Sequence, residues 1–253
     1  MKLFKHLLMC LFILTILGSS TSCAKVIKPA NKISNNASAF VQIFHTTKII
    51  SCTQGAENCP IGEFTQTGSG IKIDLIKSEN MVLTAGHVCD TQPSKEIQKS
   101  IQTIAVRDTK ENLHQAWPIR TTFYRPEIKT GDLCLLWVPT LKHTKGAKFS
   151  FNVKPEVGDD IYYLGAPKGV FHPPTVPIFR GVYSGILDQS SSIITAPAIG
   201  GSSGGPVFNK HHKIIGVVFA ANPEFHHITL MVNYDILKSF LSESKKDFKK
   251  ISN

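Results

Sequence analysis

The sequence predicts an all-β fold with a single helix at its C-terminal end. Short runs rich in Val, Ile, Phe, Tyr and Thr recur along the chain, and polar or Gly/Pro-containing turns separate them. Many short strands at this spacing are typical of a β-barrel or a β-sandwich. A doubly wound α/β sheet would need amphipathic helices of about ten or more residues between its strands. The sequence shows no such helices between the runs, and its composition, 42% hydrophobic and 18% charged, is that of a globular protein.

The predicted strands and the predicted helix cover most of the chain after residue 38. The helix is 234–248, where Ile236, Leu237, Phe240 and Leu241 fall on one helical face. The predicted strands include 39–45, 70–76, 80–85, 101–106, 132–138, 160–165, 179–187, 192–196, 213–221 and 227–233.

The first 24 residues have the pattern of a secretory signal peptide. A short basic start is followed by an uncharged apolar run, 7–17, and then by small polar residues up to Ala24. The run is too short to span a bilayer comfortably, since a spanning helix needs about 20 residues. We therefore expect cleavage after Ala24 and an exported protein, secreted or periplasmic, without a transmembrane segment in its mature form. An uncleaved anchor and lipid attachment through Cys23 remain alternatives.

The rest of the chain divides into three parts. Residues 25–38 are polar and have no apolar period, which predicts a linker or a loosely attached N-terminal arm. Residues 39–243 form the predicted folded domain, and 244–253 form a lysine-rich tail. The net charge is +10, but no basic stripe is interleaved with aromatic residues. The sequence therefore does not predict binding to nucleic acid, and it leaves the oligomeric state open.

Four cysteines follow the predicted signal peptide, and export favours disulfides between them. Four cysteines allow three pairings. Cys52 and Cys59 flank the turn-like stretch "TQGAEN", which predicts a Cys52–Cys59 disulfide and leaves Cys89 to pair with Cys134. The spacing is not the C-x₂₋₄-C of zinc sites, so we expect neither a metal nor another cofactor.

Two histidine pairs also suggest metal ligands at first sight. They are His211–His212 and His226–His227. The first pair lies between predicted strands and the second lies at the start of one, where exposed loop histidines are the usual case. We therefore expect no metal site at either pair.

A histidine and an aspartate occupy positions that suit catalysis. His87 directly follows an apolar strand, in a turn of small residues, and Asp132 immediately precedes a fully apolar run. A carboxylate that enters such a strand is at least partly buried, and a buried charge is costly unless it is paired. An imidazole N–H is a suitable partner, and the pair also fixes the tautomer of the imidazole. Taken singly, each residue could equally be an ordinary turn residue.

The stretch "AIGGSSGGPVFN", 198–209, is the candidate nucleophile loop. The pattern G-x-S-x-G matches it twice, centred on Ser202 and on Ser203. An α/β-hydrolase would present its residues in the order Ser, Asp or Glu, His, whereas this chain has His87, Asp132 and then the serines. The order histidine, aspartate, serine is that of chymotrypsin.

With His87, Asp132 and the glycine–serine stretch in this order, the sequence resembles the trypsin/chymotrypsin-like serine proteases. It is closest to the protease domains of bacterial Deg/HtrA-type enzymes and to the glutamyl endopeptidases. The resemblance implies two antiparallel six-stranded β-barrels, with the catalytic groups in the cleft between them. It also implies a protein or peptide substrate and no cofactor. The similar blocks are "TGSGIKI" (67–73), "MVLTAGHV" (81–88), "GDLCLL" (131–136), "GDDIYYLGAP" (158–167), "GGSSGGPVFN" (200–209) and "KIIGVVFA" (213–220).

The family motif Gly-x-Ser-Gly-Gly/Ser-Pro implies a role for each candidate residue. Its register makes Ser203 the nucleophile and Ser202 the variable x. His87 would act as general base and Asp132 would orient it. The backbone N–H groups of Gly201 and Ser203 would form the oxyanion hole, which needs preorganised donors. The alternative function is a catalytically silent module of this fold that acts as a binding protein, although all three triad positions are filled.

The sequence also departs from the family pattern around the specificity pocket. Ser202 replaces the aspartate of animal trypsin-like enzymes, so we do not expect trypsin-style activation. Pro197 occupies the base of the expected pocket, where an aspartate would select Lys or Arg. Val218 replaces the histidine of the glutamyl endopeptidases, and Ala220 and Ala221 replace glycines that keep the pocket open. These substrate-binding residues predict a narrow or apolar pocket and small or aliphatic residues before the scissile bond.

The resemblance also places two cysteines beside the catalytic pair. Cys89 and Cys134 lie two residues after His87 and Asp132, respectively. A disulfide between them would therefore hold the active site from behind, which we state here as a hypothesis.

Overall fold

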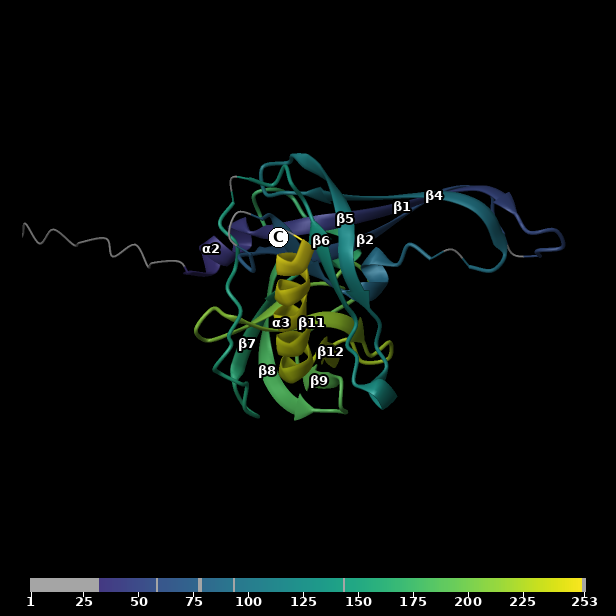
Figure 1. The fold of residues 1–253 in the computed structure, drawn as a ribbon. Helices are drawn as coiled ribbons and strands as arrows, with labels where there is room; N and C mark the ends of the chain where they lie inside the picture. The colour runs from purple at the N-terminus through teal and green to yellow at the C-terminus, as the bar shows by residue number, and fades with distance from the viewer. Residues whose placement is uncertain (1–31, 58, 77–78, 93, 143, 252–253) are drawn as a thin grey trace, which may run out of the picture. The chain divides into compact units, whose positions relative to one another are not determined.

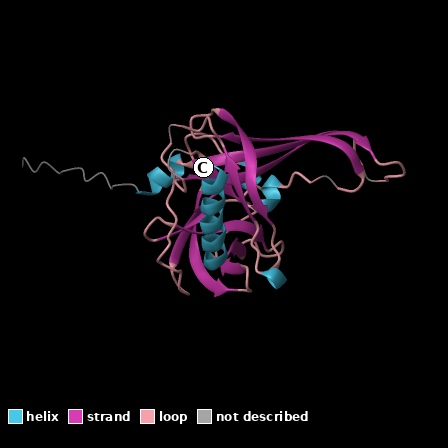
Figure 2. Cartoon of the chain, in the orientation of Figure 1, coloured by secondary structure: helices cyan, strands magenta, loops and turns pink. Residues whose placement is uncertain are grey.

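The computed structural model describes residues 32–251 except 58, 77, 78, 93 and 143. The predicted signal peptide, including Cys23, and residues 25–31 of the predicted arm lie outside the described residues. The described chain contains two closed antiparallel barrels of six strands each and a C-terminal helix (Figures 1 and 2). The predicted fold class is therefore confirmed.

The first barrel has the strand order β1-β2-β3-β6-β5-β4. Strands β1, β2 and β4 are longer than the sequence predicts, and they extend beyond the barrel as a ribbon (Figure 1). The Cys52–Cys59 disulfide closes the end of this ribbon. The six strands are β1 (Phe40–Cys52), β2 (Gly62–Ile73), β3 (Met81–Thr84), β4 (Ile97–Arg107), β5 (Leu113–Thr122) and β6 (Leu133–Trp137).

The second barrel has the strand order β10-β11-β12-β9-β8-β7. Strand β10 directly follows the serine loop and pairs with β7 and β11, so the loop is anchored in the barrel wall. The six strands are β7 (Asp160–Leu164), β8 (Ile178–Ile186), β9 (Ser191–Ile194), β10 (Pro206–Asn209), β11 (Ile214–Ala221) and β12 (Thr229–Val232).

Two of the twelve strands do not appear among the predicted ones. Strand β5 contains Pro118, which lacks a backbone N–H, and the β5–β6 register shifts between Pro118 and Arg120. Proline is tolerated in a sheet at such an irregularity, but it lowers the strand signal in the sequence. Strand β10 has only four residues and begins with Pro206.

The largest apolar cluster joins the two barrels and the C-terminal helix α3 (Tyr234–Ile251). Leu237, Phe240 and Leu241 are buried in it, and Ile236 packs against it, as the helical pattern predicts. Fully burying such a side chain contributes about 1.5–3 kcal/mol. The cluster therefore fixes the position of one barrel against the other.

Helix α3 continues through residues that the sequence assigned to a basic tail. It ends at Ile251, and on its exposed side Glu243 and Asp247 both form ion pairs with Arg120 of β5. The Arg120 guanidinium also lies over the Phe240 ring, 5.6 Å from its centroid. These contacts continue the helix past the apolar residues that marked it in the sequence. Among the described helices, none combines the length and the apolar character needed to cross a membrane.

The polar stretch before the first barrel is partly helical. Residues of the predicted arm form helix α2 (Lys32–Ser38), so the prediction of a linker or loosely attached arm is wrong for this part. The Asn36 side chain is buried, and its Nδ2 donates to the Tyr162 hydroxyl at 3.0 Å and to the His212 carbonyl at 3.1 Å. A polar residue that finds partners inside the protein gives no apolar signal, which explains the error.

Candidate active site

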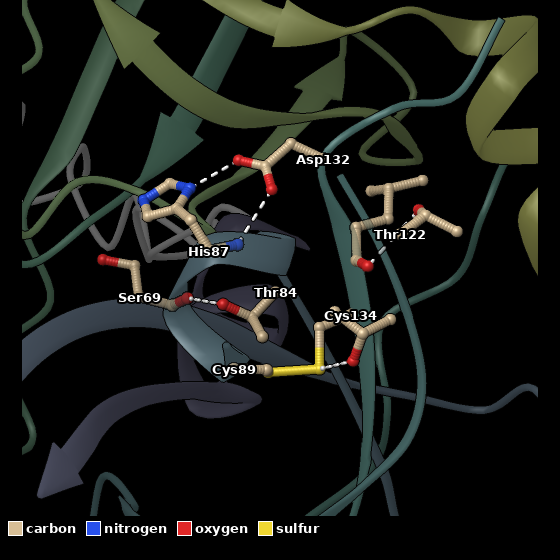
Figure 3. The surroundings of a disulfide bond; sticks show 9 residues. Ser69, Thr84, His87, Cys89, Thr122, Asp132 and Cys134 are labelled. Atoms are coloured by element: carbon tan, nitrogen blue, oxygen red, sulfur yellow. Dashed lines mark hydrogen bonds and ion pairs between the residues drawn. A yellow bond between two sulfur atoms is a disulfide. The ribbon is translucent and has the colours of Figure 1, made fainter. Parts of the chain in front are cut away.

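The candidate base and its orienting residue lie at the same end of two paired strands. Strand β3 ends at Thr84, and the short 3-10 helix η1 (Gly86–Cys89) then turns His87 toward Asp132, which immediately precedes β6. Asp132 Oδ1 accepts a hydrogen bond from the His87 backbone N–H at 2.8 Å. Asp132 Oδ2 is hydrogen-bonded to His87 Nδ1 (Figure 3). Both carboxylate oxygens are thus occupied by His87.

The exposure of the two side chains differs in the way that a general base requires. The Asp132 side chain is 6% exposed, whereas the His87 side chain is 45% exposed. Because the carboxylate only accepts, the hydrogen on Nδ1 is the one shared with Asp132. In the neutral imidazole Nε2 is then unprotonated and can accept a proton.

A glycine allows this close approach, and the sequence did not single it out. A Cβ at Gly86 would lie 2.0 Å from the Thr122 carbonyl oxygen and 2.6 Å from Asp132 Oδ1. The first contact is with backbone, so the neighbouring strand would have to move. Any side chain at Gly86 therefore conflicts with the His87–Asp132 geometry.

A disulfide joins the segments that carry the pair. Cys89, at the end of η1, is bonded to Cys134 of β6, and both are almost completely buried (Figure 3). The structure thus contains both predicted disulfides. The second one covalently ties the His87 segment to the Asp132 segment.

The serine loop reaches from the second barrel to the first, where it approaches Ser69 and the end of β3. The Ser203 carbonyl accepts a hydrogen bond from Ser69 N of β2 at 2.7 Å. Gly204 has φ +87°, and a Cβ there would lie 2.0 Å from the Ser69 carbonyl oxygen and 2.1 Å from Thr84 Oγ1. The loop therefore packs tightly against the end of β3. Among the described residues, no hydrogen bond joins Ser203 Oγ directly to His87.

Three backbone N–H groups of residues 200–204 have no acceptor among the described residues: those of Gly200, Gly201 and Ser203, of which the last two are the predicted oxyanion donors. The carbonyls of the same two peptide groups are occupied: Gly200 O accepts from Lys168 N at 2.7 Å, and Ser202 O from Gly205 N at 2.9 Å. In a planar trans peptide the N–H points opposite to the C=O. Both N–H groups therefore point away from these partners and can donate to a ligand.

A cavity of about 290 Å³ lies beside Ser203. Ala220 and Val218 are in its wall, as the sequence predicts. Pro197 is not among the lining residues; its carbonyl accepts a hydrogen bond from the Tyr163 hydroxyl, and burial raises the Tyr163 pKa to about 12. The cavity is lined by Ala198, Ile199, Gly200, Ser202, Ser203, Val218, Ala220, Ala221, Asn222, Pro223 and His226.

His226 lines the cavity, although the sequence predicts only an exposed loop histidine at this position. It is exposed, as predicted for a loop histidine, but it also borders the cavity. The backbone explains this position, since the His226 carbonyl accepts a hydrogen bond from Ala198 N at 3.0 Å and so brings the loop to the cavity wall. Within the described residues, no three His, Cys, Asp or Glu side chains group in a way that could hold a metal ion.

Comparison with known proteins agrees with this geometry. The model of the trypsin-like peptidase domain matches residues 68–217, more than half of the 253 residues. The chain belongs to the trypsin-like peptidase family. It is thus a hydrolase of the serine endopeptidase type, and its substrates are proteins or peptides. Among solved structures, the serine endoprotease from Yersinia pestis is similar, with a TM-score of 0.59 and 15% identity over 87% of this chain and 68% of that chain. At this identity the likeness supports the fold alone.

Proposed function

We propose that this protease is exported and cleaves peptide bonds through an acyl-enzyme, with the triad His87, Asp132 and Ser203. The observation that carries the proposal is the buried Asp132 carboxylate, which binds both the backbone N–H and the imidazole of His87. In the serine loop, the N–H groups of Gly201 and Ser203 have no acceptor among the described residues and are available as donors. Residues 1–24 would act as the signal peptide. The two disulfides are compatible with an oxidising compartment.

Each residue has a defined role in the proposed reaction. Ser203 Oγ bonds to the carbonyl carbon of the scissile peptide while His87 Nε2 takes its proton. The carbonyl oxygen becomes an oxyanion, which the N–H groups of Gly201 and Ser203 stabilise. The C–N bond then breaks, and His87 returns the proton to the leaving amine. A water molecule then attacks the acyl-enzyme in the same way and releases the carboxylic acid product. Asp132 stabilises the imidazolium at each step.

Labelling with a fluorophosphonate probe tests the proposal. We expect the wild-type protein to be modified at Ser203, located by peptide mapping, because only an activated serine reacts readily. Ser203→Ala and His87→Ala should abolish labelling, whereas His211→Ala, a matched change at an exposed histidine, should leave it intact. A folded wild-type protein that is not labelled would instead support the silent binding module.

The cavity supports small or aliphatic residues before the scissile bond. Its lining includes the apolar Val218, Ala220 and Ala221 beside the polar Asn222 and His226. The apolar part of the wall favours apolar side chains. Digestion of a peptide library should therefore show cuts mainly after such residues. Cuts mainly after Lys, Arg or Glu would contradict this specificity.

The size limit of the cavity can be tested at one position. We expect Ala220→Gly to widen the cavity and to raise kcat/KM for a substrate with Phe before the scissile bond, relative to one with Ala, by about tenfold. One or two methylenes in an apolar pocket are worth about 1–3 kcal/mol. Because the measurement is a ratio of two substrates, it does not depend on the fraction of folded enzyme. An unchanged ratio would show that Ala220 does not limit the cavity.

A further inference from the structure

We infer that Ser69, on strand β2 of the first barrel, is a positioning residue that holds the oxyanion loop, residues 200–204, in its donating conformation. Ser69 is outside the triad and outside the cavity beside Ser203. The inference rests on the proposed function, since it assigns the N–H groups of Gly201 and Ser203 to the oxyanion hole.

Ser69 is completely buried, and it uses each of its polar groups. Its Oγ donates to the Gly201 carbonyl at 2.7 Å and accepts from Ala166 N at 2.9 Å. Its backbone N donates to the Ser203 carbonyl at 2.7 Å, and its carbonyl accepts from Thr84 Oγ1 at 2.7 Å (Figure 3). One residue of the first barrel thus contacts the loop at two carbonyls and the Ala166 segment of the second barrel at one N–H.

The Gly201 N–H is directed by the Lys168 contact on one side of Gly201 and by the Ser69 contact on the other. Gly201 has φ +93°, and a Cβ there would lie 2.5 Å from the Ala166 carbonyl oxygen, so its backbone fits closely between Ser69 and the Ala166 segment. The Gly201 carbonyl is held by Ser69 Oγ, and the Gly200 carbonyl by Lys168 N. A flip of the Gly200–Gly201 peptide would break the Lys168 bond and replace the oxyanion donor by a carbonyl oxygen.

The Ala166 segment is itself held by the first barrel, so it offers Ser69 a fixed partner. Gln42 Nε2 donates to the Gly169 carbonyl at 3.2 Å. Arg107 donates to the Phe171 carbonyl at 3.0 Å and to Gln42 Oε1 at 2.7 Å. The hydrogen bonds that orient the loop therefore come from a rigid frame of β1, β2 and β4.

The loop has no charged residue that could do the same. Residues 198–205 contain only Ala, Ile, Gly and Ser. Ser202 is buried, and its Oγ accepts from Ile199 N at 3.3 Å, within the loop itself. Ser202 also has a side-chain hydrogen bond with Tyr163 of β7, so its partners lie in the loop and in the second barrel, whereas the Ser69 hydroxyl ties the loop to the first barrel.

Replacement of the hydroxyl tests this role. Ser69→Ala leaves Ala166 N and Gly201 O without a partner. The variant should therefore stabilise the transition state less well, because the oxyanion forms there. We expect kcat to fall about tenfold or more and KM to change less than about twofold, since a full oxyanion donor is worth about 10²–10³ in kcat. The affinity for a peptide aldehyde, whose adduct carries the oxyanion, should fall in parallel. A merely structural role would not separate kcat from KM in this way.

A matched control is Ser192→Ala, which removes another completely buried hydroxyl, hydrogen-bonded to Tyr183 in the second barrel. It should leave kcat and aldehyde affinity unchanged. A folded Ser69→Ala enzyme with wild-type kcat overturns the inference. If Ser69→Ala does not fold, Ser69→Cys keeps most of the volume with a weaker donor, and an unchanged kcat in that variant overturns it equally. A wild-type protein that neither cleaves peptides nor reacts with the fluorophosphonate overturns the proposed function and the inference together.

Discussion

Asp132→Asn should lower kcat about 10⁴-fold while the protein remains folded. The asparagine carbonyl can still accept the His87 backbone N–H, so the turn keeps its hydrogen bond. Its NH₂ group, however, would face His87 Nδ1 and donate to it. The imidazole proton would then reside on Nε2, the atom that must accept the proton of Ser203. The measurement is kcat on a peptide substrate, together with the melting temperature.

Asp160→Asn is the control for this substitution. Asp160 begins β7 and is exposed, so its replacement should change neither kcat nor the melting temperature. An Asp132→Asn enzyme that retains more than about a tenth of the wild-type kcat would show that Asp132 does not set the tautomer of His87.

The sequence could predict the contact between His87 and Asp132 because its signals are local. His87 follows an apolar strand, and Asp132 precedes another, so each residue is marked by its own neighbours. The antiparallel pairing of β3 with β6 then brings the two strand ends together. The same holds for α3, where Leu237, Phe240 and Leu241 repeat at helical spacing and are buried.

The supporting residues could not be predicted, because their roles depend on contacts that are distant in sequence. Ser69 binds residues more than 90 positions away, and nothing in "TGSGIKI" shows where its hydroxyl points. Gly86 must be a glycine chiefly because the Thr122 carbonyl approaches it most closely, from β5, a strand that the sequence did not predict because it contains Pro118. Helix α2 was missed because Asn36 finds its partners in the second barrel.

The site therefore depends on how the two barrels meet. Close contacts join the two barrels at more than one point near the site. Next to Asp132, a Cβ at Gly131 would lie 2.5 Å from Val232 Cγ1 of β12 and 2.9 Å from Ile236 Cγ2 of α3. In the serine loop, the Ser203 carbonyl accepts a hydrogen bond from Ser69 N. The second barrel thus contacts the first both next to Asp132 and at Ser203, which limits how far the serine loop can move from the first barrel.

Removal of the Cys89–Cys134 disulfide should reduce both stability and activity. The bond closes a loop of sequence separation 45. In the chain-entropy model a loop of this length corresponds to about 4 kcal/mol of unfolding free energy. Cys89→Ala/Cys134→Ala should therefore unfold at a lower denaturant concentration. Because η1 also loses its covalent tie to β6, kcat/KM should fall as His87 gains freedom relative to Asp132.

The disulfide in the ribbon provides the matched comparison. Cys52 and Cys59 close a loop of separation 7, far along the strands from His87, so Cys52→Ala/Cys59→Ala should cost about 2 kcal/mol and leave kcat/KM unchanged. Urea unfolding and peptide hydrolysis of the two double variants measure both effects. If both variants keep wild-type kcat/KM, the Cys89–Cys134 bond stabilises the barrel without positioning His87 against Asp132. Free thiols at Cys89 and Cys134 in the isolated mature protein, found by non-reducing peptide mapping, would show that this disulfide does not form.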